Sequence, residues 1–525
     1  MQVNLLKVTA FVNGKIYTSF KPLRAVRGLV VAGERVLFAG DDAKALRIAR
    51  ELGGEIIDLR GRTAIPGFVD AHVHLDSLGL SLITLDLRGV SSIEELRQRI
   101  RLYIERNPDV DVVIGRGWDQ ELFAEKRWPT RWDIDDVTGG KPAILIRVCG
   151  HAALLNTRAL EETGLADVRS PYIVRRADGE PTGIVKEEFV KQAMDRLGAR
   201  KRLLAQSIDR AQRFAAKYGV TEVGFVSCDI DAFRTLLKKW RRGELLIRVR
   251  AYLEPSSFDE MRRFLAPGFG DEYLRVTGLK IILDGSLGAR TAWLSEPYND
   301  DPSVQGAPLL DYGELKEIVG RALDGGYQVA IHAIGDAALD WVLKLYKELE
   351  VKPDDRARIE HVSVVRPEQL KEIARLGAVA VVQPHFIITD WWVVKRVGRE
   401  RASWVYAFRS MIEIGIKTAF STDAPVEPLD PFLTLHAAVT RGSDEGVELW
   451  KLTPHEAVDV REALHSYTHG SSYALCDDYA GRLEPGSYGD LVVLSNDPLE
   501  VEPRSLRDIR VLETYIGGKL VYASE

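Results

Sequence analysis

The stretch "PGFVDAHVHLD", residues 66–76, is an apolar run that ends in two histidines separated by one residue. In a β-strand, side chains two positions apart lie on the same face, so this pattern places His72 and His74 on one side of a strand end. Two imidazoles that converge in this way are suited to bind a metal ion. An isolated H-x-H motif is a weak signal, so the prediction depends on whether other strands supply further ligands.

The composition is that of a well-packed globular protein. The 525 residues are 46% hydrophobic and 28% charged, and 77 acidic against 71 basic residues give a net charge of −6. This balance does not favour binding to nucleic acid or to an anionic membrane. The sequence has no run of about 18 apolar residues, and its N-terminal segment lacks the features of a signal peptide. Because three widely separated cysteines argue against a disulfide framework, we expect a cytoplasmic protein.

Apolar, strand-like segments alternate with amphipathic helices over most of the chain. The helical segments end near glycine residues, where helix C-caps are expected. Eight strands that alternate with helices predict an α/β fold, a (β/α)8 TIM-type barrel. The predicted strands are 68–74, 219–228, 246–253, 275–284, 327–332, 357–363, 378–383 and 416–423.

Two parts of the chain do not fit the alternation. Short β-like segments at both ends predict a small β-sandwich domain formed by residues 1–62 and 475–525, with the barrel over 63–474. About 140 residues separate the first two barrel strands, which is too many for a loop. We therefore expect an inserted subdomain at about 78–215 that covers the mouth of the barrel. Glu222, in the second strand, could point into the barrel or outward against a helix.

Polar residues recur where the predicted barrel strands end, and the active sites of such barrels lie at these C-terminal ends. Any one of these residues could be structural. Their joint placement is harder to explain in that way, because four of the ten histidines fall at strand ends beside a terminal aspartate. In chain order the strand ends carry His72, His74, Lys280, Asp284, His332, His361, Gln383 and Asp423.

This pattern resembles that of the amidohydrolase superfamily. The motifs "GRGWDQ", "GHAALLNTRAL", "LKIILDGSLGARTAWL", "IHAIGDAALD", "RIEHVS" and "STDAPVEPLDP" are similar to those of the branch typified by N-substituted formamide deformylase. The resemblance covers essentially the whole chain. It implies a metal-dependent hydrolase that cleaves a C–N bond, in a non-peptide amide, formamide or cyclic amide, through a metal-activated hydroxide.

The resemblance also implies a set of metal ligands. His72 and His74 would bind a first metal and His332 and His361 a second, while Asp423 would contact the first metal and act as the general base. Zn²⁺ suits imidazole and carboxylate ligands, and Fe, Mn or Ni are alternatives. The Lys280 ammonium would be repelled by two cations, so we expect a CO2-derived carbamate that bridges two metals. The alternative is a single metal with an unmodified Lys280.

The insertion contributes two candidate residues, each with a structural role as the alternative. His151, in "CGHAALLN", could reach over the barrel mouth to hold the substrate carbonyl or a tetrahedral intermediate, and we treat it as a catalytic candidate. Trp118 could form an apolar wall of the substrate pocket, because such pockets are mostly apolar with a few polar anchors. The insertion itself would act as a lid that sets specificity.

The loops after the barrel strands contribute four more candidates for substrate binding. Asp284 and Arg290, after the fourth strand, could order that loop or bind a polar group of the substrate. Gln383 and His385, in "QPHF" after the seventh strand, are expected to contact the substrate, and a structural hydrogen bond is the alternative.

Other functions stay open at the level of sequence. An ester, lactone or phosphoester hydrolase could use the same metal centre. A non-catalytic binding protein on an inherited barrel is disfavoured, because every expected ligand is present. The expected partner is a small-molecule substrate, with no nucleic acid and no membrane, and a homodimer is a reasonable expectation.

Overall fold

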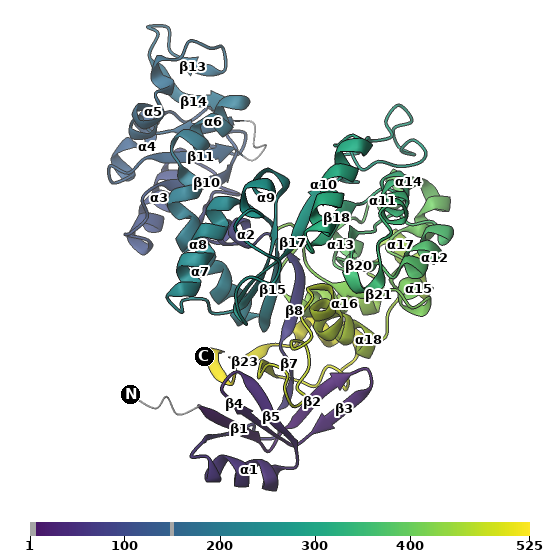
Figure 1. Cartoon of the computed structure of the whole chain (residues 1–525). Coiled ribbons are helices and arrows are strands. Elements are labelled where there is room, and N and C mark those ends of the chain that lie inside the picture. Colours follow the sequence, from purple (N-terminus) through teal and green to yellow (C-terminus); the bar gives the residue numbers. More distant parts are fainter. Residues whose placement is uncertain (1–6, 148–151, 525) are drawn as a thin grey trace. The chain divides into compact units, whose positions relative to one another are not determined.

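The computed structural model describes residues 7–147 and 152–524 (Figure 1). It separates into two compact units. The first, Met1–Leu75 with Gln212–Glu525, contains the barrel and the sheets formed by the two ends of the chain. The second, Asp76–Ala211, is inserted between the first two barrel strands. The boundary between barrel and terminal domain stays a prediction, because both belong to the first unit.

Eight parallel strands form one sheet that curves into a nearly closed barrel (Figure 1). Neighbours in the sheet follow chain order, and an isolated parallel bridge between Val73 and Ala424 joins the last strand to the first. Each strand overlaps one predicted segment, so the α/β barrel prediction is confirmed. The strands are β8 (Phe68–Val73), β15 (Val220–Cys228), β16 (Arg248–Leu253), β17 (Leu274–Ile282), β18 (Gln328–Ala333), β19 (Arg358–His361), β20 (Val379–Val382) and β21 (Lys417–Phe420).

The helices between these strands begin and end at residues suited to those positions. Asp229 caps α8 (Ile230–Arg241), where its carboxylate accepts a hydrogen bond from the backbone N–H of Ala232 at 2.8 Å. Helix α12 (Pro367–Leu376) begins with a proline and ends at Gly377, which adopts the left-handed conformation. Two further connecting helices are α10 (Tyr312–Asp324) and α11 (Asp336–Glu348).

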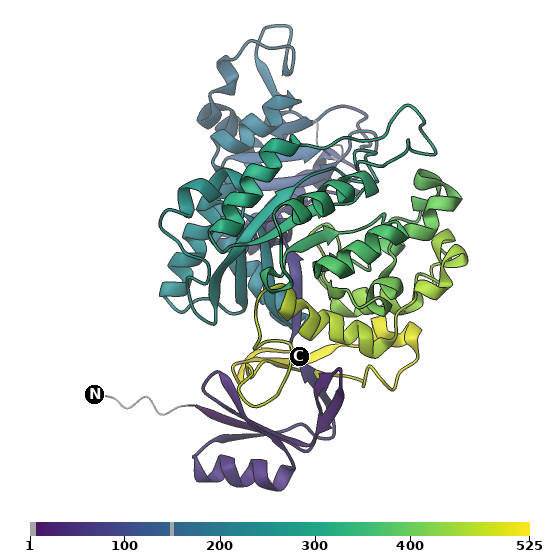
Figure 2. The same ribbon diagram turned by 45° about the vertical axis from the view of Figure 1, so that its right-hand side comes forward.

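Both ends of the chain build one six-stranded sheet (Figure 2). Its central pairing joins β7 to β22, with Pro66 opposite Leu491 in the register. A second sheet of four strands packs on it through a shared core that includes Phe11, Val31 and Val493. The predicted sandwich from both termini is therefore confirmed. The six-stranded sheet contains β2 (Lys15–Phe20), β3 (Leu23–Val26), β7 (Thr63–Pro66), β22 (Leu491–Leu494), β23 (Val511–Ile516) and β24 (Lys519–Ala523), and the four-stranded sheet contains β1 (Val8–Val12), β4 (Gly28–Ala32), β5 (Arg35–Gly40) and β6 (Glu55–Asp58).

Glu222 belongs to a buried network of charges. Its Oε1 lies 3.0 Å from Nε of Arg250, and both side chains are fully buried. Arg250 also donates to Asp477 at 2.6 Å, while Arg248 donates to Asp490 at 2.7 Å. Along β15 the side chain of Glu222 shares a face with Val226, which lies in the buried cluster with residues of the other barrel strands. Glu222 therefore points inward.

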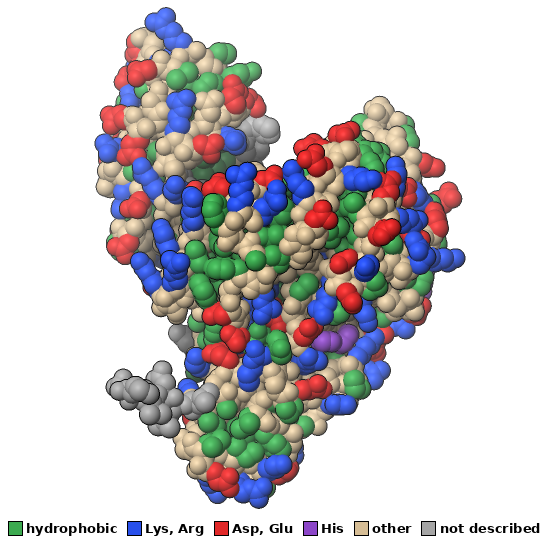
Figure 3. Space-filling view, viewed as in Figure 1, with side chains coloured by type: hydrophobic (Ala, Val, Ile, Leu, Met, Phe, Trp, Pro, Cys, Tyr) green, Lys and Arg blue, Asp and Glu red, His purple; other side chains and the backbone are tan. Residues whose placement is uncertain are grey.

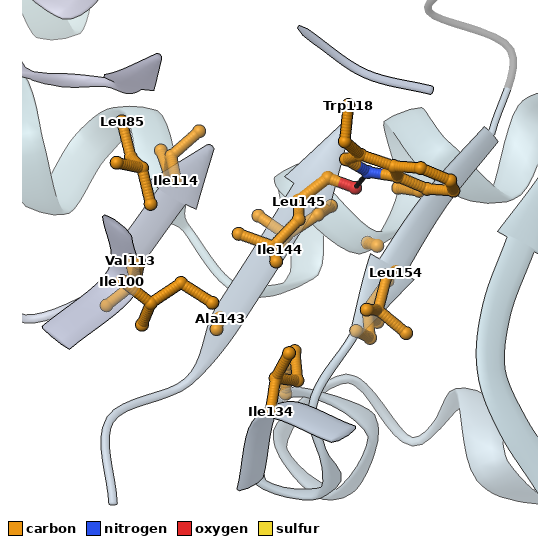
Figure 4. Close-up of a cluster of buried hydrophobic side chains, with 14 of the residues drawn as sticks. Leu85, Ile100, Val113, Ile114, Trp118, Ile134, Ala143, Ile144, Leu145 and Leu154 are labelled. Carbon is orange, nitrogen blue, oxygen red and sulfur yellow. Dashed lines mark hydrogen bonds between the residues drawn. The ribbon is translucent and has the colours of Figure 1, made fainter. Parts of the chain in front are cut away.

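The inserted unit has a hydrophobic core of its own (Figure 4). Trp118 lies in this core, fully buried, and its indole N–H donates to the carbonyl of Leu145 at 2.7 Å (Figure 4). A ring with no exposed surface cannot line a substrate pocket, so we correct the prediction and assign Trp118 to the core. The unit is built on a six-stranded mixed sheet of β9 (Leu85–Asp86), β10 (Val113–Trp118), β11 (Ala143–Arg147), β12 (Ala152–Leu155), β13 (Ile173–Arg175) and β14 (Pro181–Lys186).

The face of the molecule in Figure 3 carries acidic and basic side chains that are interspersed rather than gathered by sign. This distribution agrees with the nearly balanced composition of 77 acidic and 71 basic residues. Within residues 7–147 and 152–524, none of the helices combines the length and the apolar character needed to cross a bilayer.

Candidate metal centre

The end of β8 meets the loop after β21, and this contact brings the first three candidate ligands together. The backbone N–H of Asp423 donates to the carbonyl of His72 at 2.9 Å, and that of His74 donates to the carbonyl of Ala424 at 2.9 Å. Asp423 adopts a left-handed backbone, with φ of 58°. This conformation is uncommon for a non-glycine residue and is often found at functional sites.

The side chains of His72, His74 and Asp423 converge at this point. One ligand atom from each lies within 4.8 Å of the others. Oδ1 of Asp423 is 3.3 Å from Nε2 of His72 and 3.2 Å from Nε2 of His74. Among the described residues this buried oxygen has no hydrogen-bond partner. A buried oxygen without a partner, faced by two imidazole nitrogens, fits a divalent cation, since such an ion accepts one lone pair from each.

His332 and His361 extend the cluster from β18 and β19. The ring centroids of His361 and His72 are 5.1 Å apart, and those of His332 and His361 are 4.3 Å apart. Lys280 lies on β17, two residues before Ile282, which is the register partner of His332. The side chain of Lys280 is almost fully buried. All six predicted metal-site residues therefore lie at one end of the barrel.

Burial sets the charge of these side chains. It lowers the pKa of His361 to about 3 and lowers that of His332 well below the ordinary value, and the neighbouring Lys280 adds to both shifts. Neutral imidazole is the form that binds a metal. Burial also lowers the pKa of Lys280, although the carboxylates of Glu360 and Asp423 partly oppose this shift. A deprotonated amine is therefore more accessible at Lys280 than at an exposed lysine.

Glu360, which was missed in the sequence, positions His72. Its Oε2 lies 2.5 Å from Nδ1 of His72, and both side chains are fully buried. Arg358 donates two hydrogen bonds to the same carboxylate, at 2.7 and 2.9 Å, and a third to the carbonyl of Ala71. The pairing fixes which nitrogen of His72 faces Asp423. The available signal was a pair of opposite charges, two residues apart, inside the apolar strand "RIEHVS".

Asp70 was also missed, and it holds β8 to the loop after β21. Its carboxylate accepts hydrogen bonds from the hydroxyls of Thr422 at 2.7 Å and Tyr467 at 2.9 Å, and from the backbone N–H of His72 at 3.2 Å. Burial raises the pKa of Asp70 to about 6, although these donors favour the carboxylate. Thr422 precedes Asp423, so this contact fixes the backbone that carries the third candidate ligand.

Gln383 supports His361 in the same way as Glu360 supports His72. Its Oε1 accepts a hydrogen bond from Nδ1 of His361 at 2.7 Å, and its amide nitrogen donates to the hydroxyl of Ser421 at 2.9 Å. The amide is buried. This geometry leaves Nε2 of the candidate ligand His361 available to a metal, and it supports a structural hydrogen bond of Gln383 rather than the expected contact with the substrate.

Gln383→Leu is expected to weaken metal binding by about 10- to 100-fold, because the leucine cannot fix the orientation and tautomer of His361. Competition with a chromogenic chelator measures this affinity. Gln328→Leu is a matched control, since Gln328 is also buried and hydrogen-bonded but begins β18 at the opposite end of the barrel. Equal metal affinity in wild type and Gln383→Leu would remove Gln383 from this role.

Asp284 and Arg290 organise the loop after β17. The Asp284 carboxylate accepts backbone N–H groups of Trp293, Ile334 and Gly335, at 2.9 to 3.0 Å. Burial raises its pKa to about 6, opposed by these bonds. Arg290 forms two hydrogen bonds to the Asp300 carboxylate, at 3.0 and 3.1 Å. Of the two roles expected from the sequence, these contacts support the ordering of the loop.

His385 pairs with a carboxylate that comes from the neighbouring loop. Its Nδ1 contacts Glu427, which also accepts a hydrogen bond from the hydroxyl of Thr389 at 2.7 Å. Glu427 is buried and His385 is nearly so. The predicted catalytic residue His151 lies outside the described residues.

Comparisons with known proteins agree with this geometry. The Amidohydrolase family model matches residues 55–522. Putative amidohydrolase YtcJ of Bacillus subtilis (strain 168) is 32% identical, over 89% of this chain and 90% of that protein. N-substituted formamide deformylase of Arthrobacter pascens is 25% identical, over 97% of each. The crystal structure of an uncharacterized metal-dependent hydrolase from Pyrococcus horikoshii aligns with a TM-score of 0.83 and 42% identity, over 95% of this chain and 99% of that chain.

Proposed function

Because the chain belongs to the amidohydrolase family, we propose that it is a metal-dependent hydrolase that cleaves a carbon–nitrogen bond other than a peptide bond. The observation that carries this proposal is the convergence of His72, His74 and Asp423 around the buried, unpartnered Oδ1 of Asp423. The choice of a C–N bond rests on the family and on the similarity to a formamide deformylase.

Two groups of side chains would hold the metal. His72, His74 and Asp423 would hold the first ion, and His332 and His361 would hold a second. Zn²⁺ is the ion we propose, since it favours nitrogen and oxygen ligands, and Fe, Mn or Ni could replace it according to availability. The contacts of Glu360 with His72 and of Gln383 with His361 would orient the rings toward these ions.

The chemistry that a divalent cation supplies in such a site is a lowered pKa for bound water and polarisation of the scissile carbonyl. Asp423 would accept a proton from the attacking water and return it to the nitrogen of the leaving amine. Burial alone would raise the pKa of Asp423, but the histidines hold it well below its ordinary value, so the side chain is ionised and has the free carboxylate that the role of proton acceptor requires. His385, held by Glu427, would bind the substrate.

Lys280 would carry a carbamate. The step joins Nζ of the neutral amine to the carbon of CO2 and releases one proton, which converts a basic side chain into an anionic oxygen ligand. Burial favours the neutral amine from which this step starts. The anion would offset the positive charge of two metal ions, which an ammonium group at the same position would increase.

Metal content, measured together with the intact mass, tests the proposal. In untagged protein purified without added metal, we expect close to two divalent ions per chain by plasma mass spectrometry. Native mass spectrometry should show an increase equal to one CO2, and this increase should disappear in Lys280→Ala. Metal-loaded protein would then be tested on N-formyl and N-acyl amines beside the matching esters. If only the esters are hydrolysed, the protein is an esterase and the proposal of C–N bond cleavage is wrong. If the protein binds no metal, the proposal of a metal-dependent hydrolase is overturned.

A further inference from the structure

A cavity of about 330 Å³ lies at the end of β21 that is remote from Asp423. Lys417 and Thr418, the first residues of this strand, line it. Asp423 follows the other end of the strand, and six residues of extended chain span about 20 Å. The cavity is therefore separate from the candidate metal centre. At this end of a barrel, residues usually serve stability rather than chemistry.

Four basic side chains from different parts of the first unit line this cavity. Lys21 comes from the turn between β2 and β3, and Lys417 begins β21. His465 ends α18 (Val460–His465), and His469 lies in the π-helical turn Ser466–Gly470. The two imidazole centroids are 5.5 Å apart. No aspartate or glutamate is among the lining residues, which also include Ser466 and Tyr473.

The positive charge around the cavity is only partly compensated. Lys21 contacts Glu462 at 3.1 Å, and this carboxylate is shared with Arg409. Lys417 forms no ion pair with any described residue, and the ring of Tyr473 lies 6.0 Å from its ammonium. The charged groups that act on His469 are Lys417, Asp478, Arg482 and Glu484. The cavity beside Lys417 therefore favours an anion, since no carboxylate of the described residues neutralises the ammonium group of this lysine.

His469, which lines the cavity, also has an unsatisfied ring nitrogen, although this atom itself has almost no surface open to the cavity. Its Nδ1 is buried and has no hydrogen-bond partner among the described residues. A buried polar atom without a partner is destabilising, and most such atoms in proteins are satisfied by protein, water or ligand. Burial, together with His469, Lys21 and Lys417, lowers the pKa of His465 to about 4. The smaller contributions of Lys21 and Lys417 to this shift reflect the positive charge that surrounds the cavity.

We propose that this cavity binds a small oxyanion, a phosphate or a carboxylate, between the two lysines and the two histidines. Ammonium and imidazole N–H groups are the donors that oxyanions accept. A metal ion is disfavoured, because two lysines would repel it and no carboxylate lines the cavity. Since Lys21 belongs to the terminal sheet and the other three residues to the barrel, the bound anion would also stabilise the contact between them.

Calorimetric titration of the metal-loaded enzyme tests the proposal, with inorganic phosphate and acetate as separate probes at constant ionic strength. We expect binding in the wild type and at least tenfold weaker binding in Lys417→Met and in His465→Gln/His469→Gln. Lys371→Met, an exposed lysine of α12, should leave binding unchanged. All three variants should retain the wild-type hydrolytic activity. Because Lys417 is exposed, its substitution tests the site even if the double variant does not fold.

The two probes separate the sources of the anion. Binding of phosphate alone would indicate a phosphate site, whereas binding of acetate as well would indicate a site for carboxylates in general. Phosphate binding at the metal centre should be the same in Lys417→Met as in the wild type. Only the part of the phosphate binding that is lost in this variant is therefore assigned to the cavity. If no component of phosphate or acetate binding is lost in either variant, the proposal is overturned.

Discussion

Asp423→Asn is expected to lower kcat/KM by about 10²- to 10⁴-fold, the range typical of losing a positioned general acid–base group. The amide keeps an oxygen at the position of Oδ1, next to His72 and His74. It cannot accept a proton from water or return one to a leaving amine. Metal content should therefore stay close to that of the wild type while turnover falls. The measurement combines steady-state kinetics on an N-formyl or N-acyl substrate with metal analysis of the same preparation.

The matched control for this variant is Asp354→Asn, which changes an exposed aspartate before the start of β19, at the end of that strand opposite to His361. Its activity and metal content should equal those of the wild type. If Asp423→Asn retains full activity, Asp423 is not the general base. If it loses both activity and metal, Asp423 acts mainly as a ligand, and proton transfer must be assigned to another residue.

Glu360→Gln is expected to destabilise the protein by about 3–5 kcal/mol, because it leaves the charge of Arg358 buried without its partner. The carboxylate is fully buried and accepts two hydrogen bonds from Arg358 and one contact from His72. Urea unfolding of the metal-free protein, followed by far-UV circular dichroism, measures the change. Metal affinity should fall as well, since His72 loses the partner that orients it.

Arg358→Met/Glu360→Gln supplies the control for this interpretation. Because the double variant removes both charges, its destabilisation should be smaller than the sum of the two single effects, by about 0.5–3 kcal/mol. Additive effects would show that the two side chains contribute independently. A change below about 0.5 kcal/mol in Glu360→Gln would show that the ion pair is not needed for stability.

The stability difference between wild type and Glu360→Gln should depend on pH. Burial alone would raise the pKa of Glu360, but Arg358 and His72 hold it below its ordinary value of 4.5. A carboxylate with a lowered pKa in the folded state contributes stability that is complete above the pKa of the unfolded state. The difference should therefore be constant near neutral pH and shrink as the pH falls below about 4.5.

The barrel was predictable because its strands leave a strong local signal. Each is a short apolar run between helical segments, and the polar residues that end it stand out against that run. His332, His361 and Asp423 were found in this way, without any knowledge of their neighbours. The shared sheet of the two termini was predictable for a similar reason, since several short β-like segments gather at each end of the chain, although the N-terminal part also contains the helix α1 (Asp42–Glu51).

Partners that depend on contacts between distant segments could not be predicted. Glu360 stabilises His72 from a strand almost 300 residues away, a separation of 288 in the chain. The sequence contains no local feature that relates the two. The prediction for Trp118 was wrong because a tryptophan in a hydrophobic core and a tryptophan in the wall of a pocket have the same appearance in the sequence. Only burial distinguishes them.

The pairing of β7 with β22 has a consequence for synthesis of the protein. Pro66 and Leu491 are register partners, and β7 leads directly into the strand that carries His72. During translation the N-terminal strands emerge from the ribosome long before β22 exists, so the edge of β7 stays open for most of this time. Open strand edges invite pairing with other chains. A nascent chain of this kind is therefore exposed to pairing at β7 until β22 has been made, and the group of His72, His74 and Asp423 is complete only after most of the chain has been synthesised.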